Sequence, residues 1–180
     1  MLIQDEKVFL LKLVREVIIA KLENREMKIS KPKNEIFNKK TGAFVTLHKK
    51  NNDLRGCIGY IRGYKNLFDT IKEMAEAAAF RDPRFQEVQS FELNDIVIEI
   101  SILSDLIIVN DVKEIEVGRD GLFIESGINS GLLLPQVAKE WNWNCTQFLN
   151  ETCHKAGLSS NCWKDKNTRI YRFSAEIFSE

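Results

Sequence analysis

Two short strand-like segments joined by a polar turn constrain the fold of this chain more than any other feature. Residues 42–48 (Gly-Ala-Phe-Val-Thr-Leu-His) are rich in β-branched and apolar side chains, and residues 54–59 (Leu-Arg-Gly-Cys-Ile-Gly) follow closely. Asparagine tolerates positive φ, so Asn51 and Asn52 suit the two central positions of a hairpin turn. The sequence therefore predicts an antiparallel hairpin whose register is set by this turn.

The predicted register gathers polar side chains on one face of the hairpin. It places Thr46 opposite Cys57 and His48 opposite Arg55. Alternate residues of a strand point the same way, so these four side chains share a face, while the other face is mainly apolar. Two interpretations stay open: an ordinary amphipathic hairpin with a solvated polar face, or a small functional site.

The chemistry of the second segment favours a site. A guanidinium near a thiol favours the thiolate, which is the nucleophilic form of cysteine, so Arg55 is expected to tune Cys57. Gly56 and Gly59 would let another backbone or a ligand approach closely. We therefore predict Cys57 as a catalytic thiol. Its expected ligand-binding neighbours are Thr46, His48, Arg55, Gly56 and Gly59.

A second candidate cluster is Arg81-Asp82-Pro83-Arg84, which follows a predicted helix end. Pro83 holds Asp82 in an extended conformation. In a functional interpretation, Arg84 binds a carboxylate or phosphate and Asp82 acts as a base or orients the substrate. The alternative is an Arg–Asp brace over the helix end. Asp120, in Arg119-Asp120-Gly121, is a weaker ligand-binding candidate, because Asp-Gly is most simply a turn.

The same motifs carry a family resemblance that covers nearly the whole chain. The chain resembles the AMMECR-one family, whose prokaryotic members are called AmmeMemoRadiSam system protein A. The motifs that carry this resemblance lie, in order, at residues 44–47, 54–59, 80–85, 118–122, 131–138 and 155–158. The resemblance implies two interleaved lobes with a groove between them, and Memo-like and radical-SAM proteins as partners. It implies no settled reaction.

Hydrophobic periodicity predicts the remaining elements. The expected class is α+β with mainly antiparallel sheets, because hairpins outnumber strand–helix–strand units. Helices are predicted at residues 5–22, 66–80, 135–141 and 144–157. Asn66 and Asn144 are the predicted N-caps of the second and the fourth of these helices. Strands are predicted at residues 95–104, 106–109, 122–125, 131–134 and 169–178.

Bulk composition limits the classes of protein that this chain can be. Its 180 residues suffice for a single domain of two subdomains, and its formal net charge is zero. Neutrality argues against binding of duplex nucleic acid or of an anionic membrane, although a small nucleotide pocket stays open. No apolar run approaches the roughly 20 residues of a membrane span. With no signal-peptide pattern in the sequence, we expect a cytoplasmic protein.

The four cysteines do not suggest a disulfide scaffold in a chain of this size. Cys145, Cys153 and Cys162 cluster in sequence, but their spacing matches no common zinc pattern, so neither a metal nor another cofactor is expected. Cys145 and Cys153 fall on the apolar stripe of a predicted helix. We expect both to be inert packing thiols.

Three functions remain open from the sequence, and whether the protein is an enzyme is undecided among them. The first is an enzyme that uses Cys57 as a nucleophile or redox thiol, with Asp82 nearby. The second is a noncatalytic binding or adaptor protein. The third is a nucleotide- or RNA-handling module, for which a small anionic ligand fits the neutral charge better than a long nucleic acid.

Overall fold

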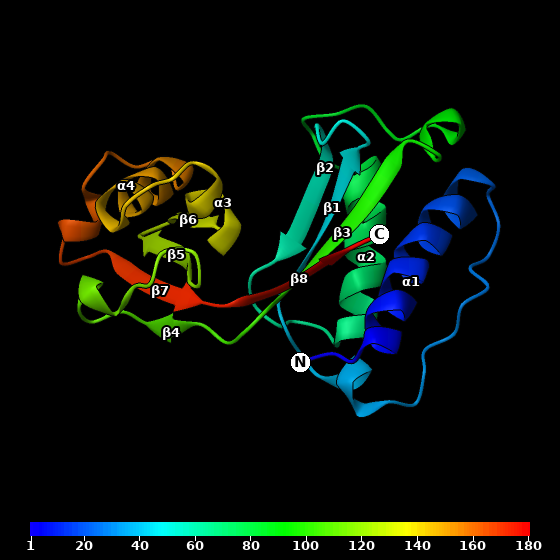
Figure 1. Cartoon of the computed structure of the whole chain (residues 1–180), viewed down its shortest axis with the longest axis horizontal. Helices are drawn as coiled ribbons and strands as arrows, with labels where there is room; N and C mark the ends of the chain where they lie inside the picture. Colours follow the sequence, from blue (N-terminus) through cyan, green and yellow to red (C-terminus); the bar gives the residue numbers. More distant parts are fainter. The chain divides into compact units, whose positions relative to one another are not determined.

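Four α-helices and two four-stranded antiparallel sheets make up the chain, which the computed structural model describes over all residues 1–180 (Figure 1). Residues 1–103 and 176–180 form a first unit, and residues 104–175 form a second. The predicted α+β class is confirmed. None of the helices has the length and apolar content needed to cross a membrane.

The first unit packs two helices against one face of its sheet (Figure 1). The strand order is β2-β1-β3-β8, and the core lies between the sheet and the helices. The elements are α1 (Gln4–Leu22), β1 (Ala43–Lys49), β2 (Leu54–Tyr60), α2 (Leu67–Phe80), β3 (Ile96–Leu103) and β8 (Ala175–Ser179).

Helix α2 lies directly under the edge strand β2. It begins where the Asn66 side chain accepts a hydrogen bond from the Asp69 backbone N–H at 3.0 Å, the N-cap that the sequence predicts. Small alanines on its inner face allow a close approach to the sheet, and a Cβ added at Gly56 would overlap the carbonyl oxygen of Ala78. Gly56 is therefore required by packing between the helix and the strand.

The hairpin register is confirmed over most of its length and wrong near the turn. Thr46 pairs with Cys57, as predicted, but His48 pairs with Leu54 and leaves Arg55 without a partner. The turn causes the difference. Asn52 adopts a φ of 67° and the Lys49 N–H bonds the Asp53 carbonyl, so the loop has three residues instead of two. Arg55 is then the extra residue of a bulge, which redirects its side chain.

The second unit places two helices beside a sheet with the order β4-β7-β5-β6. Its core joins the sheet to the inner face of α4 around Leu122, Ile124, Phe148 and Leu149. The elements are β4 (Ile107–Ile108), β5 (Gly121–Ser126), β6 (Asn129–Leu133), α3 (Pro135–Glu140), α4 (Cys145–Lys155) and β7 (Arg169–Phe173).

Two expectations about the end of the chain are wrong. The single strand predicted at 169–178 is two strands, β7 and β8, which belong to different sheets and separate at Ser174. Cys153 is buried, as predicted, but it is not a free thiol, because a disulfide joins it to Cys162. Cys145 stays free and half-buried.

Candidate functional site

Cys57 lies in the middle of β2, at the open edge of the first sheet. Its backbone N–H donates to Asp82 Oδ2 at 2.9 Å, and its carbonyl accepts a hydrogen bond from Arg84 Nη2 at 3.1 Å. These backbone groups point away from β1, where a further strand would otherwise bind. The side chains of Asp82 and Arg84 thus take up the backbone hydrogen-bonding groups of Cys57 that an additional strand would use.

The outward direction of these groups also explains the contact between Thr46 and the thiol. Thr46 and Cys57 form the non-hydrogen-bonded type of antiparallel pair, in which side chains approach most closely. Thr46 Oγ1 donates to Cys57 Sγ at 3.3 Å. Thr46 is buried, with 6% of its surface exposed, whereas Cys57 is only partly buried.

Asp82 is a buried, permanently charged anchor for this cluster. It accepts hydrogen bonds from Arg84 Nε at 2.9 Å, Nη2 at 2.7 Å and the Arg84 backbone N–H at 3.1 Å. The bond from the Arg84 side chain holds the pKa of Asp82 at about 2, although burial opposes this. A carboxylate with so low a pKa is a poor proton acceptor at neutral pH, so its geometry suits orientation more than base catalysis.

Burial raises the pKa of the Cys57 thiol above its ordinary value. The Thr46 hydrogen bond and the charge of Arg84 lower this pKa, and the carboxylates of Asp82 and Glu99 raise it, with burial the largest effect. The thiol is therefore neutral at pH 7. The cation that acts on it is Arg84, whereas the sequence pointed to Arg55.

Arg55 is engaged elsewhere. Its Nε and Nη2 donate to the two carboxylate oxygens of Glu92 at 2.7 and 3.0 Å, and only 8% of its side chain is exposed. This pair holds the pKa of Glu92 below its ordinary value. Arg55 and Arg84 both lie near the ring of Phe85, since their guanidinium carbons are 6.0 and 5.5 Å from its centre. Each arginine, however, is paired with a different carboxylate, Arg55 with Glu92 and Arg84 with Asp82.

The remaining predicted residues take different places. His48 lies on β1 with a buried Nδ1 that has no hydrogen-bond partner. Gly59 makes room for the ring of Phe44, which a Cβ at that position would overlap. Asp120 belongs to the second unit, where it is buried and accepts hydrogen bonds from Arg119 Nε at 2.9 Å and from the Glu116 backbone N–H at 2.9 Å. There it fastens the loop before β5.

Sequence reasoning missed Glu92, Glu99 and Phe85 as neighbours of the site. Phe85 is the last residue of the family motif at residues 80–85, so the sequence did contain a signal that could have pointed to it. Glu92 lies 37 positions after Arg55, and no local spacing rule connects two residues so far apart.

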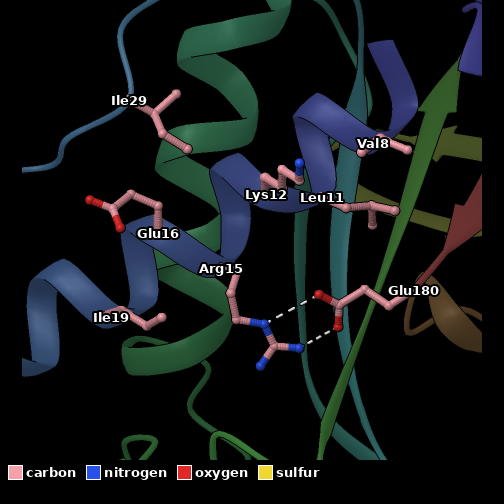
Figure 2. Close-up of a pocket in the computed structure, with 8 residues that line it drawn as sticks. All are labelled: Val8, Leu11, Lys12, Arg15, Glu16, Ile19, Ile29 and Glu180. Carbon is pink, nitrogen blue, oxygen red and sulfur yellow. Dashed lines mark hydrogen bonds and ion pairs between the residues drawn. The ribbon is translucent and has the colours of Figure 1, made fainter. Parts of the chain in front are cut away.

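One hollow of the first unit lies away from this cluster. It has a volume of about 440 Å³ and runs along the outer side of α1, between Ile29 and Glu180 (Figure 2). Val8, Leu11 and Ile19 give it an apolar lining, and Arg15 is hydrogen-bonded to Glu180 across it. None of the predicted site residues lines it. Nowhere in the chain do three or more histidine, cysteine or acidic side chains come together to hold a metal ion.

Comparison with known proteins gives one consistent answer. A model of the AMMECR1 family matches residues 11–178. A protein from Methanothermobacter thermautotrophicus is 44% identical over 184 residues, covering 98% of this chain and 95% of that protein. A protein from Thermococcus onnurineus is 45% identical, covering 96% of this chain and 89% of that protein.

A solved structure agrees with this match. The crystal structure of an uncharacterized protein from Pyrococcus horikoshii superposes with a TM-score of 0.89 at 41% identity, covering 96% of this chain and 90% of that one. The sequence motifs around Cys57 and Asp82, the fold and the extent of these matches agree. The chain belongs to the AMMECR1 family.

Proposed function

We propose that this protein binds a small anionic ligand at Cys57 and uses the thiol to recognise it or react with it. One observation carries the proposal: two separate segments, β1 through Thr46 and the loop after α2 through Asp82 and Arg84, contact this one cysteine. The Cys57 sulfur is hydrogen-bonded to Thr46, its backbone N–H to Asp82 and its carbonyl to Arg84. Such convergence on a partly accessible thiol supports a role beyond packing.

The charge distribution supports an anionic ligand. Arg84 uses Nε and Nη2 for Asp82 and Cys57, while its Nη1 makes no hydrogen bond, and 49% of the side chain is exposed. Nη1 is therefore available to a carboxylate or phosphate next to the thiol. The His48 Nδ1, buried without a partner on β1, is a further polar group of the same unit.

The raised pKa of the Cys57 thiol supports ligand binding as the first event at this site. A reaction of the thiol would follow binding. A neutral thiol is a weak nucleophile, and Asp82 is too acidic to take its proton at neutral pH. Reaction at Cys57 would need a ligand or partner that lowers its pKa. Noncatalytic binding needs no such change, which makes it the alternative form of the same proposal.

Membership of the AMMECR1 family supports Memo-like and radical-SAM proteins as partners. We expect these proteins to co-purify with the chain from a cell that contains all three. Recovery of the chain alone, under gentle conditions and at low salt, would count against this part of the proposal.

Mass spectrometry under nondenaturing conditions tests the ligand. The protein purified from its native cell should carry a small molecule that Arg84→Gln and Cys57→Ser reduce and that Cys145→Ser leaves in place. Cys145 is the matched control, because it is the other free, half-buried cysteine. Equal retention by all variants would place the ligand elsewhere, and a Cys57 that iodoacetamide never labels would contradict an accessible thiol.

A further inference from the structure

The second unit contains a hollow that is separate from the Cys57 site and has no assigned role. It has a volume of about 270 Å³ and lies beside the start of β7 and the short 3₁₀ helix Cys162–Lys164. Val109, Val112, Trp163 and Ile170 form its apolar floor, and all four pack against the core of the unit. Such a floor favours an apolar ring.

The rim of the hollow is polar and positively charged. Lys164 and Arg169 line it, together with Asn110 and Thr168, and no acidic side chain does. Neither cation forms an ion pair. The Lys164 ammonium lies 4.9 Å from the ring centre of Trp163, directly over the apolar floor. Two unpaired cations at the mouth of an apolar hollow favour a ligand with an anionic group.

Three acidic side chains near these cations bind backbone amides, and a fourth, Glu125, lies directly opposite Arg169 in the pairing of β5 with β7. Asp111 accepts from the Lys113 N–H at 2.9 Å, and Asp165 accepts from the Asn167 N–H at 2.9 Å. Glu114 accepts from the Asp111 N–H at 3.0 Å. Each of these three carboxylates thus stabilises a local turn.

The wall that carries Trp163 is fixed before any ligand binds. Trp163 Nε1 donates to Asn150 Oδ1 at 2.8 Å, and the Asn161 N–H donates to the same oxygen at 3.2 Å. Between these two residues, Cys162 is tied to Cys153 of α4 by the disulfide. Helix α4 therefore holds the wall at three successive positions. A preformed wall lowers the entropic cost of binding.

We propose that this hollow binds a small aromatic anion. The ring lies on the floor of Val109, Trp163 and Ile170, and the carboxylate or phosphate contacts Lys164 and Arg169. A purely apolar ligand would leave the two cations unused, and a bare anion would leave the floor empty. The site differs in position and in residues from the one proposed at Cys57, and either can exist without the other.

Phenyl phosphate is a suitable probe, with benzyl alcohol supplying the ring alone and inorganic phosphate the anion alone. The chain has three tryptophans, so ¹H–¹⁵N spectra contain three indole N–H signals, and Trp163→Phe identifies the one from Trp163. Phenyl phosphate should shift this signal saturably at concentrations where neither fragment does. Trp141 and Trp143 should keep their signals, which also reports an intact fold.

Charge variants decide the role of the rim. Lys164→Gln and Arg169→Gln should each weaken binding about tenfold, the usual loss for one charge-assisted contact. Lys166→Gln is the matched control, since Lys166 is an exposed cation close by that does not line the hollow. Shifts confined to Trp141 or Trp143, equal weakening by Lys166→Gln, or phosphate binding as tightly as phenyl phosphate would each overturn the proposal.

Discussion

At the scale of single residues, the thiol of Cys57 and the carboxylate of Asp82 act on each other in two ways. Asp82 binds the Cys57 backbone and so fixes the position of the sulfur, yet its charge raises the thiol pKa. Arg84 opposes this effect, because it neutralises Asp82 and lowers the pKa of the thiol directly. Burial and the Thr46 hydrogen bond also act on the pKa of the thiol, and Arg84 is the cation that lowers it.

Replacing Arg84 by glutamine should slow alkylation of Cys57. Removing the cation raises the thiol pKa further, so iodoacetamide at pH 8 should react about three- to tenfold more slowly than with the wild type. The pH dependence of the rate measures the pKa. Arg81→Gln, an exposed cation of the same loop, is the control and should change the rate little. Faster labelling of Arg84→Gln would show that access, instead of charge, limits the reaction.

The Asp82–Arg84 pair should also stabilise the fold at neutral pH and lose this effect in acid. The pKa of Asp82 is about 2 in the folded protein, below its ordinary 3.8. Its contribution is thus fully present above pH 4 and disappears as the pH falls through 2. We expect about 1–2 kcal/mol, since the half-exposed Arg84 is screened by solvent. Urea unfolding between pH 5 and 2 measures it.

Asp82→Asn tests this assignment. The variant should unfold at lower urea concentration at pH 5 and match the wild type more closely near pH 2. Arg84→Gln should flatten the same part of the stability curve, because the Arg84 side chain is the largest cause of the low pKa. If either variant lost stability between pH 5 and 2 as steeply as the wild type, the Asp82–Arg84 pair would be excluded as the source of this pH dependence.

At the scale of the elements, the sequence predicts features that depend on local chemistry. The Asn66 cap of α2 and the Asn144 cap of α4 were both found from residue type and spacing. The pairing of Thr46 with Cys57 followed from alternation and burial. Each of these signals lies within a few residues of the feature that it predicts.

The missed features depend on contacts distant in sequence. The bulge at Arg55 matters because Glu92 receives its side chain, and the brace on Cys57 comes from residues 82 and 84. The strand-like pattern continues across Ser174 although the chain changes sheet there, because an extended segment has the same period of two residues in either sheet. Alternation reports burial but does not identify the sheet.

Gly56→Ala should destabilise the contact between α2 and β2. The added methyl would overlap the Ala78 carbonyl oxygen, and backbone atoms cannot rotate away, so the helix must shift. We expect a loss of about 2–3 kcal/mol in the free energy of unfolding, measured by thermal denaturation. Gly127→Ala is the comparison: it meets no neighbouring atom, and its cost comes only from a φ of 60°. Equal losses would show that space at Gly56 is unimportant.

Reducing the disulfide should lower the stability of the second unit. The bond closes a short loop, with its two cysteines nine positions apart, which corresponds to about 2–3 kcal/mol from chain entropy. Guanidinium unfolding followed by tryptophan emission, with and without dithiothreitol, measures the change. Cys162→Ser should show the lower stability and no response to reductant, whereas Cys145→Ser should respond like the wild type. Identical curves for the wild type under both conditions would contradict the prediction.

At the scale of the whole molecule, the chain leaves the first unit at residue 103 and returns to it at residue 176. The returning strand β8 completes the first sheet next to β3. Glu176 pairs with Lys7 at 2.9 Å, and Glu180 accepts a hydrogen bond from the Ile98 N–H at 3.1 Å and also pairs with Arg15. The first unit is therefore completed by residues 176–180, which follow the whole second unit in the chain.

Deleting residues 176–180 should thus weaken the first unit and leave the second unit folded. The deletion exposes the edge of β3 and leaves Arg15, which also bonds the carbonyls of Leu93 and Ile96, without its carboxylate. Hydrogen exchange in α1 and β3 should become at least about tenfold faster, because local opening costs less. All three tryptophans lie in the second unit, so tryptophan emission reports that unit separately.

Glu180→Gln is the milder variant of the same experiment, since it keeps the strand and removes only the charge that faces Arg15. Its exchange should rise near Ile98 and Arg15 by less than in the deletion, with no change in tryptophan emission. If the deletion altered the emission as strongly as it altered exchange in β3, the two units would unfold together. In that case β8 would stabilise the whole chain, and the division at residues 103 and 176 would have no thermodynamic meaning.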